Sequence, residues 1–206
     1  MCLRLVILNK IRNVGYLATD SGCLVVDQAK MDQIGKTPEN ITVADFQKCL
    51  IEVAEIGNSK IIQLDPFRAI AYTGWAVSMD SVECAVKQCQ SVEDLSMIPN
   101  LHLFYMQYDP NGIRLYDIKD YSIEPMFEDI GENVGVSWAI PGGKSADKLF
   151  WDLYGSYYCG VYAYSCESGK LKGALQSILD ETRKEVPILG GELHLLEISG
   201  EGGEFV

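Results

Sequence analysis

The chain has 206 residues, of which 48% are hydrophobic and 22% are charged, so it is long and apolar enough to bury a core. Its 17 basic and 29 acidic side chains give a formal net charge of −12, and a field of this sign repels phosphate backbones and anionic lipid surfaces. We therefore expect a single domain over residues 1–206 that binds neither nucleic acid nor a membrane.

The apolar runs indicate where in the cell the protein is expected, and the cysteines and histidines indicate whether it is expected to bind a metal. No apolar run approaches the roughly 20 residues that cross a bilayer, and no basic-then-apolar signal precedes the first strand, so we expect a cytoplasmic protein. The seven cysteines are odd in number and include no C-x-x-C pair, which fits neither a disulfide scaffold nor a zinc module. His102 and His194 have no partner at ligand spacing. We expect no metal and no cofactor.

The first part of the chain is predicted to form short strands and one helix. The runs LRLVIL (residues 3–8) and VGYLATD (14–20) are rich in β-forming residues and flank a polar turn, which predicts a hairpin. CLVVD (23–27) follows as another strand. A helix is predicted to begin at Thr42, a good N-cap followed by apolar residues at helical spacing, and to end at residues 57–58.

The middle of the chain is predicted to be mostly strands. KIIQL (60–64) and RAIAYTG (68–74) surround an Asp-Pro turn, since proline presets the dihedral angle of a turn and cannot donate to a ladder. Residues 75–89 carry apolar side chains three and four apart, which predicts a helix with one buried stripe. Residues 101–127 form a predicted three-strand meander, in which the DPNG turn (109–112) is the strongest hairpin signal of the chain.

The last part of the chain is predicted to hold two helices and a strand. SADKLFWDLYG (145–155) is predicted to be a short helix, and GKLKGALQSILDETRKEV (169–186) a longer one with one apolar face. ELHLLEIS (192–199) is predicted to be a strand. Strands, a helix, more strands, a helix and a strand in this order favour the α+β class, with an antiparallel sheet pair covered by helices.

Three segments resemble one known family. SKIIQLDPFRAIAYTG (59–74), followed by a helix, resembles the part of proteasome β-type subunits in which a catalytic lysine begins a strand. Two further segments resemble the N-terminal and C-terminal parts of proteins in this family. They are the first hairpin with LATDSG (17–22), and a helix followed by ILGGELHLLEISGEGG (188–203). The chain thus resembles the proteasome β-type, HslV and Anbu-like N-terminal nucleophile (Ntn) hydrolases. The resemblance implies an Ntn-hydrolase-like four-layer sandwich, with two antiparallel sheets between helical layers, and homo-oligomeric rings.

The resemblance also implies a site. In this family the first residue of the mature chain attacks an amide carbonyl while its own α-amine accepts the proton. Removal of Met1 would leave Cys2 as this residue. Asp20 matches the family aspartate after the first hairpin, and Lys60 matches the lysine that begins the strand. The implied function is a peptidase or amidohydrolase with catalytic Cys2, Asp20 and Lys60, acting on a peptide or small amide substrate.

Two alternatives stay open. The family's acidic residue and serine near the Gly-Gly step match Val186 and Leu189 here, its site-orienting serine matches Ser137 only loosely, and a helix-bearing insert spans about residues 30–58. These departures, or a retained Met1, would leave a non-catalytic ring or scaffold subunit. The other alternative is an unrelated α+β binding domain. Outside the resemblance, Cys2 reads as a small strand residue, Asp20 as a turn residue, and Lys60 as an edge lysine that discourages aggregation.

Overall fold

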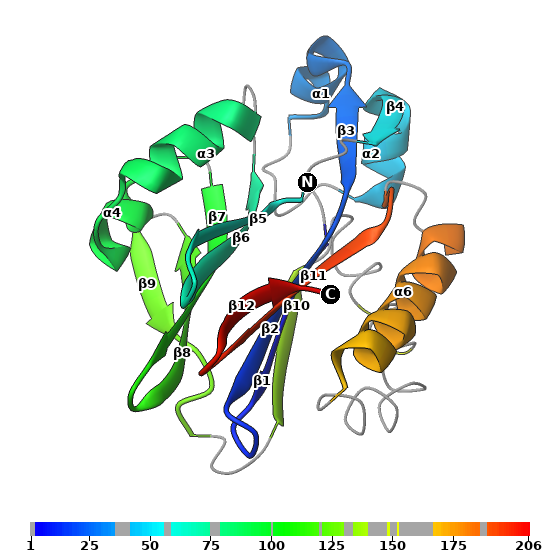
Figure 1. Cartoon of the computed structure of the whole chain (residues 1–206). Helices are drawn as coiled ribbons and strands as arrows, with labels where there is room; N and C mark the ends of the chain where they lie inside the picture. Colours follow the sequence, from blue (N-terminus) through cyan, green and yellow to red (C-terminus); the bar gives the residue numbers. More distant parts are fainter. Residues whose placement is uncertain are drawn as a thin grey trace. The chain divides into compact units, whose positions relative to one another are not determined.

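The structure is a computed structural model that describes residues 3–35, 42–55, 59–74, 79–99, 101–119, 121–129, 134–139, 148, 152, 167–185 and 189–206. These residues form twelve strands in three antiparallel sheets and five helices (Figure 1). The chain divides into two compact units. We call residues 4–19, 59–138 and 194–206 the sandwich unit and the remainder the α6 unit, and describe each by itself.

One sheet of the sandwich unit begins with the predicted first hairpin. Strands β1 (Arg4–Asn9) and β2 (Val14–Asp20) pair with Arg4 opposite Thr19 and Asn9 opposite Val14. The sheet order is β10-β1-β2-β11-β12, and its other strands are β10 (Val134–Ala139), β11 (Leu193–Ser199) and β12 (Gly202–Phe205). The predictions of the hairpin and of the strand over residues 192–199 are confirmed.

The second sheet of this unit is a continuous meander of five strands: β5 (Ile61–Asp65), β6 (Arg68–Gly74), β7 (Leu101–Asp109), β8 (Gly112–Lys119) and β9 (Ser122–Pro125). Both predicted turns follow from side-chain chemistry. Asp65 accepts the N–H of Phe67 at 2.8 Å, and Asp109 accepts that of Asn111 at 2.7 Å. Gly112 then has a φ of +114°, which favours glycine.

The core of the sandwich unit lies on both faces of the second sheet. One face packs on the first sheet through a buried cluster that includes Val6, Leu17, Phe104, Met106 and Leu196. The other face is covered by helices α3 (Met79–Gln88) and α4 (Val92–Ser96), whose Val82, Val86 and Leu95 pack on Ile70, Leu103 and Tyr105 (Figure 1). The helix predicted over residues 75–89 is confirmed over Met79–Gln88.

The described residues of the α6 unit form the third sheet and helices α1, α2 and α6. Strands β3 (Gly22–Val26) and β4 (Leu50–Glu55) pair as a two-stranded antiparallel sheet. Helices α1 (Gln28–Ile34) and α2 (Val43–Cys49) lie between them in sequence, and α6 (Ser168–Glu185) buries Leu171, Leu175, Ile178 and Leu179. The long helix predicted over residues 169–186 is confirmed, whereas most of residues 145–155 lie outside the described part.

The predicted Ntn-hydrolase-like four-layer sandwich of the α+β class is wrong. The described residues are mostly β, in three sheets rather than two, and within the sandwich unit the described helices cover one face of one sheet. The helix predicted from Thr42 to residue 56 is also too long, since it ends at Cys49 and Leu50 begins strand β4. The apolar residues at 50–54 suggested helical spacing, but they belong to a strand. This strand pairs with β3, which lies more than twenty positions earlier in the sequence.

No helix within the described ranges is long and apolar enough to cross a membrane.

Candidate functional site

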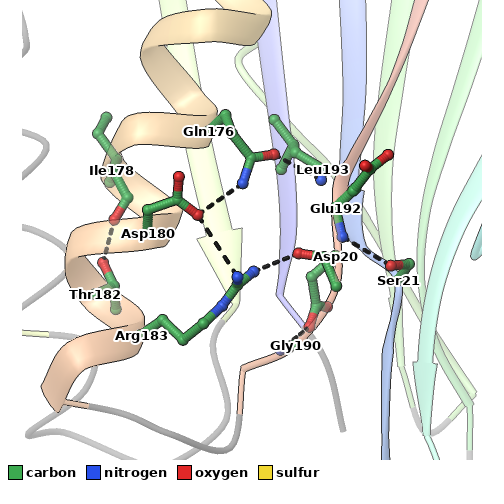
Figure 2. Close-up of polar contacts among 11 residues, drawn as sticks. Asp20, Ser21, Gln176, Ile178, Asp180, Thr182, Arg183, Gly190, Glu192 and Leu193 are labelled. Atoms are coloured by element: carbon green, nitrogen blue, oxygen red, sulfur yellow. Dashed lines mark hydrogen bonds and ion pairs between the residues drawn. The ribbon is translucent and has the colours of Figure 1, made fainter. Parts of the chain in front are cut away.

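Asp20, a residue predicted to be catalytic, ends strand β2 with its side chain buried in the α6 unit. Its residue is 1% exposed, and its carboxylate accepts two backbone hydrogen bonds. Oδ1 accepts the N–H of Leu3 at 2.8 Å, and Oδ2 accepts the N–H of Gly190 at 3.2 Å. One carboxylate therefore joins the N-terminal segment to the segment that precedes strand β11. Figure 2 shows Asp20 beside Gly190 of the second segment.

The backbone of residues 20–22 pairs with that of residues 190–192. The N–H of Ser21 donates to the carbonyl of Glu192 at 3.0 Å, and the N–H of Gly22 donates to that of Gly190 at 2.9 Å. The Ser21 hydroxyl oxygen also accepts the N–H of Glu192 at 2.9 Å. The buried polar groups at the end of β2 are thus paired by a segment about 170 positions away in sequence, as buried polar groups require.

Two glycines allow this close approach. A Cβ on Gly191 would lie 1.8 Å from Oγ of Ser21, and its φ is +71°, in the left-handed region. A Cβ on Gly22 would lie 2.6 Å from Cα of Gly190, so the two backbones could not keep their present distance. Gly22 and Gly191, the second glycine of the Gly-Gly step, are therefore required by this close packing.

Helix α6 holds the other side of the same segment. Oε1 of Gln176 accepts the N–H of Leu193 at 2.9 Å, and Nη2 of Arg183 donates to the carbonyl of Gly191. Asp180 lies between these side chains on the helix, 2.8 Å from Nε2 of Gln176 and 3.6 Å from Nη1 of Arg183 (Figure 2). Residues 176, 180 and 183 follow at helical spacing, so all three project from one face.

Lys60 lies in the sandwich unit, immediately before strand β5. It is 6% exposed, and its carbonyl accepts the N–H of Tyr72 at 3.2 Å. Cys2 and Val186 lie outside the described residues, Leu189 is buried in the α6 unit, and Ser137 lies on β10. The structure therefore describes two of the three predicted catalytic residues, each within its own unit.

No protein-family model and no curated protein matches this sequence.

A second polar cluster, in the sandwich unit, was missed by the sequence analysis. Arg4 of β1 is fully buried, with its guanidinium carbon 4.3 Å from the centre of the Phe104 ring and Nη2 2.7 Å from Nδ1 of His102. Nε2 of His102 contacts Oδ1 of Asp117 on β8. A guanidinium only donates, so Nδ1 accepts, and the ring is neutral with its proton on Nε2, directed at Asp117.

Burial lowers the pKa of His102 below its usual range. The hydrogen bond to Asp117 raises it, and the positive charges of Arg4 and Lys119 lower it again. Both ring nitrogens are occupied in this arrangement, so the ring has no free nitrogen with which to accept a proton from a substrate. We interpret the cluster as structural.

Among the described residues, no group of three or more His, Cys, Asp or Glu side chains is placed to hold a metal ion. The arrangement around Asp20 can fix the backbone at Leu3 and Gly190. A buried carboxylate with two N–H donors cannot move without losing hydrogen bonds to a charged group, which are among the stronger ones.

The contributions of Ser21, Gln176 and Arg183 were not predicted. The only sequence signal for them was the pair of adjacent glycines between a helix and a strand, which marked a close backbone approach without naming its partner.

Proposed function

We propose that this protein is an amide hydrolase whose nucleophile is the thiol of Cys2, exposed as the N-terminal residue by removal of Met1. The observation that carries the proposal is the hydrogen bond from Leu3 to Asp20. Leu3 directly follows Cys2 in sequence, and its N–H is held at 2.8 Å by a carboxylate that is 1% exposed. An enzyme whose N-terminal residue is the nucleophile must hold that residue at a defined position, and a hydrogen bond from the next residue to a buried carboxylate can do so.

The chemistry is that of an N-terminal thiol. The α-amine of Cys2, whose ordinary pKa is about 7.7–8.0, takes the thiol proton as sulfur adds to the amide carbonyl. The same amine then returns the proton to the leaving nitrogen as the C–N bond breaks, which leaves a thioester. Water, deprotonated by the amine, adds to the thioester carbonyl, the C–S bond breaks, and the released thiolate takes up the proton. The substrate class is a peptide or a small amide.

Asp20 and Lys60 have different support in this proposal. Asp20 positions the backbone that carries the nucleophile. Lys60 is assigned to the site by the family resemblance. A lysine as buried as this one needs groups that compensate its charge, which favours a specific role over that of a solvated surface lysine. The role that the resemblance implies for the Lys60 ammonium is to lower the pKa of the thiol. We further propose a homo-oligomer, as the family resemblance implies, and a cytoplasmic location, as the apolar runs of the sequence favour.

The second candidate is a non-catalytic ring or scaffold subunit. It is favoured by the fact that both oxygens of Asp20 already accept backbone N–H groups, which a purely structural carboxylate would also do. The two candidates differ in the reactivity of Cys2.

Alkylation kinetics test the proposal. The purified protein is treated with iodoacetamide across a pH series, and the modified cysteine is located by peptide mapping. Cys2 is expected to react faster than the exposed Cys84 near pH 7, with an inflection below the ordinary thiol value of about 8.5. Lys60→Gln should move that inflection upward.

Two variants serve as controls. Cys84→Ala removes an exposed competitor on α3 and should leave the Cys2 profile unchanged, whereas Cys2→Ala should abolish the fast reaction. Reaction of Cys2 no faster than that of Cys84 would contradict the enzyme and favour the scaffold.

A further inference from the structure

We propose that Arg183 is a positioning residue for the N-terminal nucleophile: through residues 190–191 it fixes Asp20, and through Asp20 it fixes the segment that carries Cys2. The catalytic meaning of this inference rests on the proposed function. The mechanical part, which links a helix side chain to the Leu3 backbone, does not.

The backbone groups of residues 190–193 form hydrogen bonds with two partners, residues 20–22 and helix α6. The even-numbered residues bond to the end of β2: the Gly190 N–H to Asp20, the Gly190 carbonyl to Gly22, and both backbone groups of Glu192 to Ser21. The odd-numbered residues bond to α6: the Gly191 carbonyl accepts from Arg183, and the Leu193 N–H donates to Gln176. The segment is thus held between residues 20–22 on one side and helix α6 on the other.

Arg183 bonds to the carbonyl of Gly191, a residue whose backbone is conformationally permissive. Gly191 has a φ of +71° and no side chain, so its backbone has little intrinsic preference for the observed conformation. The charged donor on its carbonyl supplies that preference. Gly190, the adjacent residue, gives Asp20 one of its two backbone donors, so movement at residue 191 would be transmitted to the carboxylate.

Arg183 is itself held by the helix. Its Nη1 lies 3.6 Å from Oδ1 of Asp180, and the same oxygen accepts Nε2 of Gln176 at 2.8 Å. The guanidinium is therefore presented to Gly191 by a line of three side chains on one helix face (Figure 2). The next residue, Lys184, is exposed and pairs with Glu181 at 2.6 Å. It carries the same charge as Arg183 but does not bond to the carbonyl of Gly191, so it can serve as a control.

Amide hydrogen exchange on the full-length protein tests the inference. Arg183→Met should speed exchange of the Gly190 and Leu3 N–H groups about tenfold, because the loss of a charged donor loosens the segment locally. Arg183→Lys keeps a donor for the Gly191 carbonyl and should restore most of the protection. Lys184→Met should leave both rates at the wild-type value, and the Phe104 amide in β7 reports whether any effect is global.

Four results would overturn the inference: unchanged exchange at Leu3 in Arg183→Met, an equal rise at Phe104, the same effect in Lys184→Met, or no recovery in Arg183→Lys. A second readout concerns catalysis, since iodoacetamide alkylation of Cys2 at neutral pH should slow in Arg183→Met and recover in Arg183→Lys. If Cys2 proves unreactive in the wild type while Leu3 exchange still responds as expected, the proposed function fails and the mechanical link stands.

Discussion

Nη2 of Arg4 lies 2.7 Å from Nδ1 of His102, and this contact joins strand β1 of one sheet to strand β7 of the other within the sandwich unit. Because arginine stays protonated and only donates, His102 must remain neutral to accept the bond. A proton on Nδ1 would remove the acceptor and place two cations side by side. The contact between the sheets is therefore sensitive to acid.

Acid should weaken the fold through His102. Its pKa is lowered in the folded state, chiefly by burial, so the unfolded chain binds the proton more readily as the pH falls. The stability contribution is fully present above the unfolded value of about 6.5 and is lost as the pH falls through 6.5 toward the lower folded value. Urea unfolding between about pH 7.5 and 5.5 measures the slope.

A variant isolates this contribution. His102→Asn keeps an acceptor near the position of Nδ1 and cannot titrate, so its stability should depend less on pH than that of the wild type. His194→Asn, which changes the other histidine, should retain the wild-type slope. An undiminished slope in His102→Asn would show that other groups carry the acid sensitivity.

Removal of the Arg4 guanidinium should cost more than removal of an exposed one. Arg4→Met loses the donor to His102 and the contact with the Phe104 ring, so we expect a loss of about 2–4 kcal/mol in the free energy of unfolding. Arg114 pairs with Asp109 at 2.7 Å but is 53% exposed, so Arg114→Met should cost about 1 kcal/mol or less. Equal losses in urea unfolding would contradict the structural importance of the cluster.

Gly191 should tolerate no side chain. Gly191→Ala adds a Cβ 1.8 Å from Oγ of Ser21 in a residue with positive φ, and we expect a loss of roughly 3–5 kcal/mol. Gly35, at the end of α1, has a similar φ of +62°, but none of the described atoms would lie within 4 Å of its Cβ. Gly35→Ala should therefore cost only the backbone strain, about 1–2 kcal/mol. Thermal unfolding of the two variants side by side separates the steric contribution from the strain.

Gly173 offers a change in the opposite direction. It lies inside helix α6, and no atom of the described residues lies within 4 Å of the position that a Cβ would take. Gly173→Ala should therefore stabilise the protein by about 0.5–1 kcal/mol. An increase in the thermal midpoint is the expected result. A decrease would mean that a partner outside the described residues occupies that side of the helix.

Local signals in the sequence predicted both Asx turns and most of the strands. The Asp65 and Asp109 turns are set by side-chain bonds to backbone two residues on, which depend on adjacent residues only. Helix α2 begins at its predicted N-cap because Thr42 and Asp45 bond to each other's backbone. Interactions of this range can be inferred from residue order.

Distant pairings were not predictable in this way. The strand over Leu50–Glu55 was assigned to a helix because its partner β3 lies far back in the chain. The four-layer fold was implied by the family resemblance, and the order of the elements, which favoured an antiparallel sheet pair, does not fix how many sheets the strands form. At the site, Asp20 was selected from a local motif, but its partners Leu3 and Gly190 lie 17 and 170 positions away. Arg183 had no signal because its acceptor is a backbone carbonyl.

The most direct test of the central claim is the intact mass of the protein before and after incubation with an aldehyde. An N-terminal cysteine presents an amine and a thiol on adjacent carbons, which condense with an aldehyde to a thiazolidine with loss of water. We expect a starting mass without Met1 and a single aldehyde adduct that is absent in Cys2→Ala. Retention of Met1 on all molecules made in the native host, with no adduct, would contradict it.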